Sequence, residues 1–237
     1  ELEGVKEELL KKSKMINIEL NEEQINQFYT YMKMIQEWNE KINLTTITEE
    51  ECVYLKHFYD SLTLFRDIDL NKNIKICDVG SGAGFPGVVL KIFFPNIKIT
   101  LIDSLNKRII YLNDIIEKLE LTNIEALHYR MEEFSKIHEE EYDYITARAV
   151  SQLPILCEIS VKALKVNGSL VFMKANCEEE LLGIEKKIDK LGLKIDKVDK
   201  FVLPIENSNR SIITIDKYCK TNKIYPRTID KIKKNPL

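Results

Sequence analysis

The chain has 237 residues, of which 44% are hydrophobic and 31% are charged, and its net charge is −3. This composition suits one globular domain with a modest extension and excludes a disordered chain or a fibre. The five cysteines form no C-x-x-C pair, and no apolar run reaches the roughly 20 residues that span a bilayer, so we expect a soluble cytoplasmic protein without a disulfide framework or a metal site.

The first 72 residues are predicted to form a helical cap. Asn21 and Gln24 have the spacing of a capping box, and apolar residues recur at helical intervals as far as Trp38. This pattern predicts an amphipathic helix over residues 21–41. Two further helices are expected, at residues 3–15 and 49–66.

From residue 74 onwards, short β-branched runs alternate with helical segments, which is the pattern of a parallel α/β sheet. Strands are predicted at 74–79, 97–102, 142–147 and 169–173, helices at 109–119 and 178–191, and a terminal edge hairpin from runs 198–203 and 212–215. We divide the chain into a helical cap (1–72), an α/β core (73–217) and a basic tail (218–237).

A cluster of glycines follows the first predicted strand. Four of the chain's eight glycines fall at positions 80, 82, 84 and 87, directly after Asp78. Glycines there let the backbone turn tightly and approach a ligand, although a purely structural turn is the alternative. The second strand ends at Asp103, whose carboxylate could accept hydrogen bonds from both ribose hydroxyls of a nucleoside. The acid before the first glycine favours an S-adenosylmethionine-dependent methyltransferase over an NAD-dependent oxidoreductase.

The C-terminal end is strongly basic. Residues 217–237 hold seven basic residues and one acid, a local charge of +6, which leaves −9 on residues 1–216. The basic residues are Lys217, Lys220, Lys223, Arg227, Lys231, Lys233 and Lys234. They are candidate contacts for RNA phosphates, and a solvated, partly disordered terminus is the alternative. About four contacts would give a log–log salt slope of roughly −3, which truncation after Asp216 should flatten.

Short motifs from about residue 20 to the end together resemble one family. They are Trp38 with Asn43-Leu44-Thr45, His57-x-x-Asp60-Ser61, the run from Asp78 to Gly87, Leu101-Ile102-Asp103-Ser104, Lys107-Arg108, Arg130-Met131-Glu132-Glu133, Arg148-Ala149, Tyr225-Pro226-Arg227 and Pro236-Leu237. The chain resembles the RsmG (GidB) family. One departure is Lys56, where the family usually has an arginine that can bind phosphate or carboxylate through a planar fork.

This resemblance implies a bacterial Rossmann-like class I methyltransferase with a mostly parallel seven-stranded sheet, helices on both faces and an N-terminal helical extension. It implies methyl transfer from S-adenosyl-L-methionine to N7 of a guanine in 16S ribosomal RNA, within the small subunit or an assembly intermediate. The cofactor-binding residues that it implies are Gly80, Gly82, Gly84, Phe85, Asp103, Met131, Glu132 and Arg148.

Guanine N7 has an exposed lone pair and loses no proton, so the reaction needs positioning and no general base. We expect Arg130 and Arg148 to be the positioning residues, with one of them facing the guanine or its phosphate. The alternative is an ion pair with Glu132 or Glu133. A non-catalytic RNA-binding assembly factor is a further alternative to the enzyme.

Other reactive side chains are expected to be structural. His57, Asp60 and Ser61 have the spacing of a local hydrogen-bonded cluster on one helix face. Cys157 lies in an apolar run without a basic partner, so it is predicted to be a core residue and not the nucleophile that carbon methylation would need. His138 is also placed outside the site.

Overall fold

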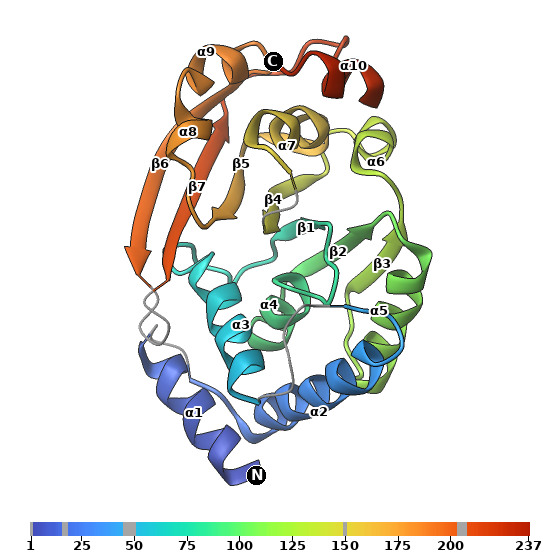
Figure 1. The fold of residues 1–237 in the computed structure, drawn as a ribbon, viewed down its shortest axis with the longest axis vertical. Coiled ribbons are helices and arrows are strands. Elements are labelled where there is room, and N and C mark those ends of the chain that lie inside the picture. Colours follow the sequence, from blue (N-terminus) through green and yellow to red (C-terminus); the bar gives the residue numbers. More distant parts are fainter. Residues whose placement is uncertain (1, 16–18, 45–50, 149–150, 203–207) are drawn as a thin grey trace. The chain divides into compact units, whose positions relative to one another are not determined.

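The computed structural model describes residues 2–15, 19–44, 51–148, 151–202 and 208–237 (Figure 1). The chain forms two compact units. The first unit comprises Glu1–Asn73 and Ser81–His128, and the second comprises Ile74–Gly80 and Tyr129–Leu237. The three-part division into cap, core and tail follows different boundaries and stays a prediction.

The strands form one seven-stranded sheet in the order β3-β2-β1-β4-β5-β7-β6. They are β1 (Lys75–Val79), β2 (Lys98–Asp103), β3 (Ile124–His128), β4 (Tyr142–Arg148), β5 (Leu164–Lys174), β6 (Leu193–Val202) and β7 (Asn209–Lys217). The pairs β2/β3, β1/β4 and β4/β5 are parallel, whereas β5/β7 and β6/β7 are antiparallel. The predicted α/β class with a mostly parallel seven-stranded sheet is confirmed.

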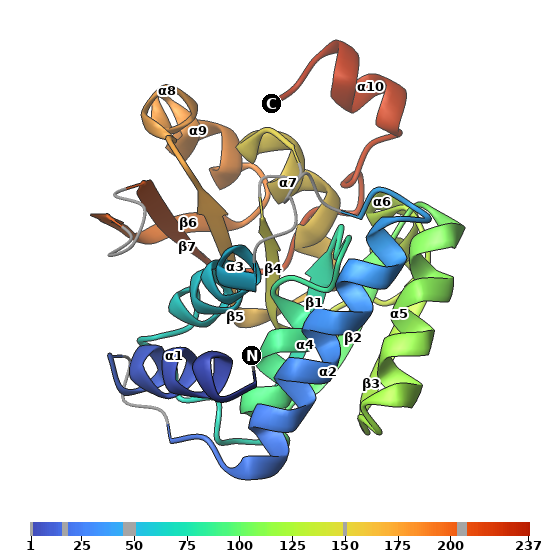
Figure 2. The same cartoon turned by 60° about the horizontal axis from the view of Figure 1, so that its bottom comes forward.

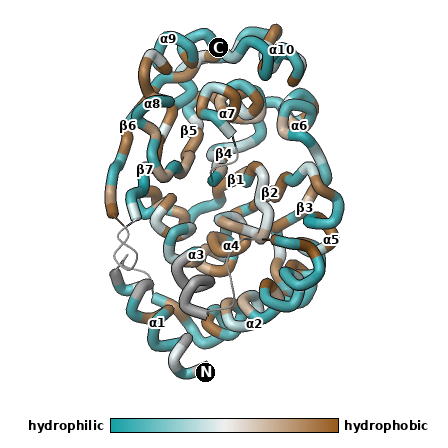
Figure 3. Tube along the Cα trace, in the orientation of Figure 1, coloured by the Kyte–Doolittle hydropathy of each residue, from teal (hydrophilic) through white to brown (hydrophobic). Residues whose placement is uncertain are grey.

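The first unit contains five helices among its described residues. They are α1 (Leu2–Met15), α2 (Glu22–Asn39), α3 (Glu51–Thr63), α4 (Gly87–Phe93) and α5 (Asn106–Lys118). The predicted capping box starts α2. The Asn21 side chain accepts from the Gln24 backbone N–H, and the Gln24 side chain accepts from the Asn21 backbone N–H. Helix α2 packs beside α4 and α5, and α4 is almost entirely apolar (Figures 2 and 3).

The second unit contains α6 (Met131–Ile137), α7 (Leu153–Ser160), the 3-10 turn η1 (Val161–Ala163), α8 (Glu178–Leu181), α9 (Ile184–Asp189) and α10 (Ile229–Lys234). The prediction of one helix over 178–191 is wrong, since α8 and α9 are separate. Leu182 has an extended ψ of 117° and Gly183 a left-handed φ of 68°, a conformation that glycine adopts without a side-chain clash.

The edge hairpin is confirmed, with β6 at the edge and β7 between β5 and β6. Strand β6 starts at Leu193, earlier than predicted. The sequence pattern misses its first residues because most side chains of β6 are at least partly exposed and show little apolar alternation. Strand β3 has the same weak pattern and no range is predicted for it. Leu203, the predicted end of the first hairpin run, lies outside the described residues.

The basic tail is partly folded. It contains α10, and the Arg227 guanidinium and backbone N–H both donate to the fully buried Glu158 carboxylate on α7, with a shortest N···O distance of 2.7 Å. Lys217 is the last residue of β7 and is also buried. Within the described residues, no helix is long and apolar enough to cross a membrane.

Candidate functional site at the glycine-rich turn

The glycine-rich turn is held by its own backbone and by the strand that ends at Asp103. Ser81 N–H donates to the carbonyl of Ile102 on β2 at 3.2 Å, and the Ser81 carbonyl accepts from Gly84 N–H at 2.8 Å. Gly84 has φ of +101°, a conformation that L side chains rarely adopt. These bonds fix the backbone of the turn before α4 begins.

Asp103 lies at the carboxyl end of β2, with only 2% of its surface exposed. One carboxylate oxygen accepts from Gly82 N–H at 3.1 Å and the other accepts from Leu105 N–H at 2.9 Å. Arg108 Nη1 lies 3.5 Å from the first oxygen. The structure therefore brings two predicted site residues, Gly82 and Asp103, into direct contact. A carboxylate has about four acceptor positions, so the two backbone bonds leave capacity for further donors.

Two tyrosines hold the turn from neighbouring helices. Tyr31 on α2 and Tyr111 on α5 both donate their hydroxyls to the Ala83 carbonyl, at 2.6 Å and 2.8 Å. Both side chains are fully buried. Neither tyrosine is among the predicted site residues, because Tyr31 is 52 positions from Ala83 and its helical spacing signals only burial.

Phe85 and His57 belong to an aromatic cluster in the first unit. Phe85 is 9% exposed, and its ring centroid lies 5.2 Å from that of His57 and 6.0 Å from that of Phe58. The Ser61 hydroxyl donates to the backbone carbonyl of His57 at 2.8 Å, and the cluster predicted for the side chains of His57, Asp60 and Ser61 stays a prediction. Lys56 is in α3, but its side chain lies outside the described part of the structure.

In the second unit, Gly80 and Arg148 lie at the carboxyl ends of paired strands. Gly80 comes directly after β1 and has φ of +69°, and Arg148 is the last residue of β4. Because Asp78 pairs with Thr146 in the parallel register, Gly80 and Arg148 lie at the same end of the sheet, where the parallel strands have their carboxyl ends. Arg148 is half-buried.

The other predicted site residues of this unit surround the start of α6. Arg130 is the N-cap residue of α6, in extended conformation, and its side chain is exposed. Met131 and Glu132 form the first turn and are both buried. An exposed cation therefore lies directly before two buried side chains.

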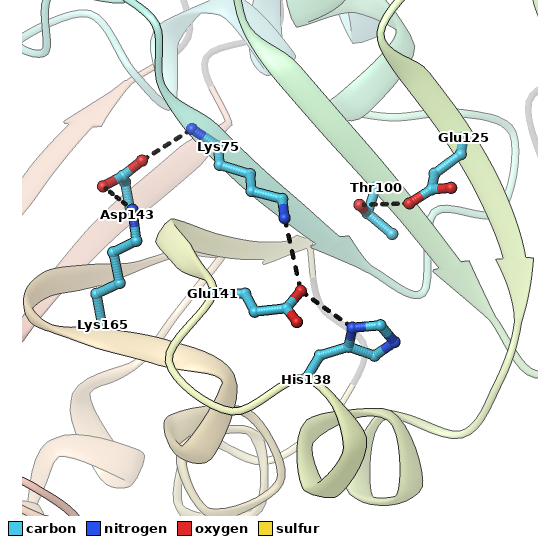
Figure 4. Close-up of polar contacts among 7 residues, drawn as sticks. All are labelled: Lys75, Thr100, Glu125, His138, Glu141, Asp143 and Lys165. Atoms are coloured by element: carbon cyan, nitrogen blue, oxygen red, sulfur yellow. Dashed lines mark hydrogen bonds and ion pairs between the residues drawn. The ribbon is translucent and has the colours of Figure 1, made fainter.

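A polar cluster lies at the opposite, amino-terminal end of β1 and β4. In Figure 4, Lys75 donates its backbone N–H to Asp143 at 2.9 Å, and its ammonium group lies 3.5 Å from Glu141. His138 contacts the same Glu141 carboxylate at 3.0 Å, and Lys165 contacts Asp143 at 3.2 Å. In the first unit, Thr100 on β2 contacts Glu125 on β3. The contacts of the second unit join the starts of β1, β4 and β5 to the loop before β4, and His138 lies away from the strand ends that carry Gly80 and Arg148.

Two sequence predictions concern reactive groups: Cys157 is expected to be a core residue, and no metal site is expected. Cys157 is fully buried in α7, as predicted, and burial raises the pKa of its thiol far above the ordinary value. A neutral, enclosed thiol is a poor nucleophile. Across the described ranges, no group of three or more His, Cys, Asp or Glu residues is placed to hold a metal ion.

Comparison with known proteins identifies similar sequences over nearly the whole chain. The model of the GidB family, described as rRNA small subunit methyltransferase G, matches residues 24–212. A protein named ribosomal RNA small subunit methyltransferase G from Staphylococcus carnosus is 45% identical over 233 residues, covering 97% of both chains. The protein of that name from Oceanobacillus iheyensis is 47% identical over 93% of this chain and 94% of its own.

Solved structures share the fold at low sequence identity. A SAM dependent methyltransferase from Aquifex aeolicus superposes with a TM-score of 0.52 at 18% identity, covering 68% of this chain and 90% of that one. M. jannaschii TYW2 in complex with AdoMet gives a TM-score of 0.54 at 15% identity, covering 73% of this chain and 79% of that one. At these identities the likeness concerns the fold alone.

Proposed function

This chain belongs to the GidB family of rRNA small subunit methyltransferase G proteins, and we propose that it transfers a methyl group from S-adenosyl-L-methionine to N7 of a guanine in small-subunit ribosomal RNA. The observation that carries the proposal is the bond from Gly82 to the buried Asp103 carboxylate at a strand end, in a chain 45% identical to a named relative over 97% of its length. The NAD-dependent oxidoreductase and the non-catalytic assembly factor are not favoured by these relatives.

The chemistry of Asp103 fits a nucleoside with two free ribose hydroxyls. Two backbone N–H groups donate to this carboxylate and Arg108 Nη1 lies 3.5 Å from one oxygen, so the remaining acceptor capacity is available to ribose hydroxyls. We propose that Asp103 binds the ribose and that Met131 and Glu132 border the adenine. The backbone at the glycine-rich turn approaches the cofactor closely, at Gly80, Gly82, Gly84 and Phe85. Arg148 is the remaining residue of the proposed cofactor-binding set.

When bound, S-adenosyl-L-methionine supplies an electrophilic methyl group that the N7 lone pair accepts without losing a proton. The side chains therefore act by orientation, and holding two reactants in line can contribute about 7–11 kcal/mol to lowering the barrier. A guanidinium on N7 itself would occupy the reacting lone pair, so Arg148 or Arg130 must contact O6 or a phosphate. The exposed Arg130 suits a phosphate, and the half-buried Arg148 suits the base.

The test is methylation of unmodified small ribosomal subunits with methyl-labelled S-adenosyl-L-methionine, with assembly intermediates and free rRNA alongside. Chemical cleavage at N7-methylguanine maps the label. A single labelled N7-methylguanine supports the proposal and identifies the preferred substrate. Label at any other atom overturns the acceptor assignment. Cofactor binding without label on any substrate favours the non-catalytic factor.

Replacing Arg148 with Ala tests the positioning role. We expect turnover to fall by on the order of 10²-fold, the loss that follows a small misplacement of reactants, with the fold retained. Arg66→Ala is the matched control, because Arg66 is an exposed arginine beyond the end of α3. An Arg148→Ala enzyme as active as the control would remove Arg148 from the mechanism.

The basic tail is proposed to bind rRNA phosphates through five exposed lysines, Lys220, Lys223, Lys231, Lys233 and Lys234. Truncation after Asp216 is a poor test, because it also removes the structural Lys217 and Arg227. Replacing the five lysines with Gln keeps those contacts. If about four of them meet phosphates, the log–log salt slope should flatten by roughly 3. An unchanged slope would overturn this contact.

A further inference from the structure

A lysine and a glutamate of the second unit, Lys174 and Glu180, contact the chain shortly after Arg148. Lys174 is the last residue of β5, and Glu180 lies in α8. The Lys174 ammonium group lies 3.5 Å from Glu180 Oε1 and also donates a hydrogen bond to the Ser151 carbonyl. Glu180 Oε1 accepts from the backbone N–H of Leu153 at 2.9 Å. The Lys174–Glu180 pair therefore holds the backbone at both Ser151 and Leu153.

The strand register places this pair beside the strand end that carries Arg148. Arg148, the last residue of β4, pairs with Met173 on β5, and Lys174 is the next residue of β5. Ser151 is three positions after Arg148, so their Cα atoms are at most about 11 Å apart. The ladder between β4 and β5 thus holds the chain before Arg148, and the Lys174–Glu180 pair holds it after Arg148.

The pair is more enclosed than an ion pair at the surface. Only 10% of the Lys174 side chain and 24% of the Glu180 side chain are exposed. Water and salt screen such a pair less than an exposed one, and each partner also makes a hydrogen bond to the backbone. Removing one side chain would leave a polar group of low exposure without its partner, so the structure favours keeping both.

Glu180 also caps helix α7. The first backbone N–H groups of a helix have no partner within the helix, and the N-cap residue Gln152 makes no side-chain hydrogen bond to them. The Glu180 carboxylate accepts from the first of these groups, at Leu153, where the helix dipole favours a negative charge. The start of α7 is therefore fixed by a residue 27 positions away.

We propose that Lys174 and Glu180 are positioning residues that hold Arg148 in place for methyl transfer, acting through Ser151 and Leu153. The proposal rests on the proposed function, in which Arg148 orients the base, and extends it by two residues that contact neither reactant. A role in stability alone would lower the free energy of unfolding and leave the reaction of the folded enzyme unchanged. A positioning role also lowers kcat, and this effect depends on Arg148.

The first test compares two buried lysines. Lys174→Met should lower kcat for methylation of small ribosomal subunits about tenfold, less than the roughly 10²-fold loss expected for Arg148→Ala. Lys217→Met is the matched control, because Lys217 also donates to backbone carbonyls, at the start of β5 and so at the opposite end of that strand. Both variants should unfold at a lower temperature, but Lys217→Met should keep the wild-type kcat. If kcat is the same in the two variants, the proposal is overturned.

Two further comparisons separate positioning from a general loss of structure. In an Arg148→Ala background, Lys174→Met should lower kcat by less than about twofold, because Arg148 is no longer there to be held. A full further tenfold loss would overturn the proposal. Glu180→Leu should lower kcat about tenfold, whereas Glu180→Gln should keep most of the activity, since its amide oxygen can still accept from Leu153 N–H.

Amide hydrogen exchange tests the contacts without turnover. The Leu153 N–H should exchange faster in Glu180→Leu and in Lys174→Met than in the wild type, and at the wild-type rate in Lys217→Met. Unchanged exchange in Glu180→Leu would overturn the proposal while the proposed function stands. A wild-type protein with the expected exchange pattern that methylates no ribosomal RNA would overturn the proposed function, and with it the role of the Lys174–Glu180 pair in catalysis.

Discussion

Replacing Gly84 with Ala tests how tightly α2 holds the glycine-rich turn. A Cβ at this position would lie 2.5 Å from the Tyr31 hydroxyl oxygen and 2.8 Å from Val88 Cγ2. The residue would also have to keep a φ of +101°, which costs an L residue about 1–2 kcal/mol or more. If the Tyr31 hydroxyl is pushed away from Ala83, about 0.5–1.5 kcal/mol of hydrogen-bond stability is lost as well. We expect a total destabilisation of roughly 1.5–3.5 kcal/mol from these two terms.

A double-mutant cycle with Tyr31→Phe separates the two causes. Tyr31→Phe alone should cost about 0.5–1.5 kcal/mol, since Tyr111 still donates to the Ala83 carbonyl. In the double variant the hydroxyl that collides with the new Cβ is absent, so the hydrogen-bond loss is counted once. The double variant should therefore be about 1 kcal/mol more stable than the sum of the single effects predicts. The contact with Val88 and the backbone strain should remain.

Equilibrium unfolding in urea measures each free energy of unfolding, and titration with S-adenosyl-L-methionine measures whether the turn still binds. Gln27→Met is the matched control, because Gln27 is also on α2 and donates to the Leu119 carbonyl at 3.1 Å, away from the turn. Gly84→Ala combined with Gln27→Met should be additive. Additivity within about 0.5 kcal/mol for the Tyr31 pair would refute the predicted collision.

Three further predictions concern the second unit. Lys217→Met should destabilise the fold by about 1–3 kcal/mol in urea unfolding, because it leaves two backbone carbonyls of the α7–β5 connection without the buried ammonium group; an unchanged midpoint would contradict this. The hydrogen bond to Asp189 raises the pKa of Tyr218 to about 12, so between pH 10 and 12 the folded chain keeps a proton that the unfolded chain loses, and stability falls as pH rises. In the Asp189→Ala variant one tyrosine should therefore ionise at a lower pH than in the wild type, closer to pH 10, as measured by phenolate absorbance. Identical titrations of variant and wild type would exclude the bond. A thiol reagent should label Cys219 in the native protein and leave Cys157 unmodified until unfolding, because Cys219 is exposed and burial raises the pKa of Cys157. Peptide mass spectrometry locates the label, and a labelled Cys157 in the native protein would contradict this prediction.

Local signals in the sequence were sufficient for the elements that carry strong patterns. The capping box predicts the start of α2, because both of its hydrogen bonds join residues three positions apart. The glycines after β1 and the acid at the end of β2 mark the turn and Asp103, because a tight turn and a strand-end carboxylate each need particular residue types. Exposed strands such as β3 and β6 lack alternation and are missed or shortened.

Residues distant in the chain meet only in the folded protein, and these meetings decide the rest. Tyr31 and Tyr111 reach one carbonyl of the glycine-rich turn from two helices, which no local spacing encodes. Arg227 resembles the other cations of the tail in sequence, but the buried Glu158, 69 positions away, makes it a structural anchor. Sequence alone therefore determined the class of fold and the family, whose signals are local or recur along the chain. Tertiary structure decided which charges are buried and paired and which are exposed, because burial and pairing depend on segments that the fold brings together.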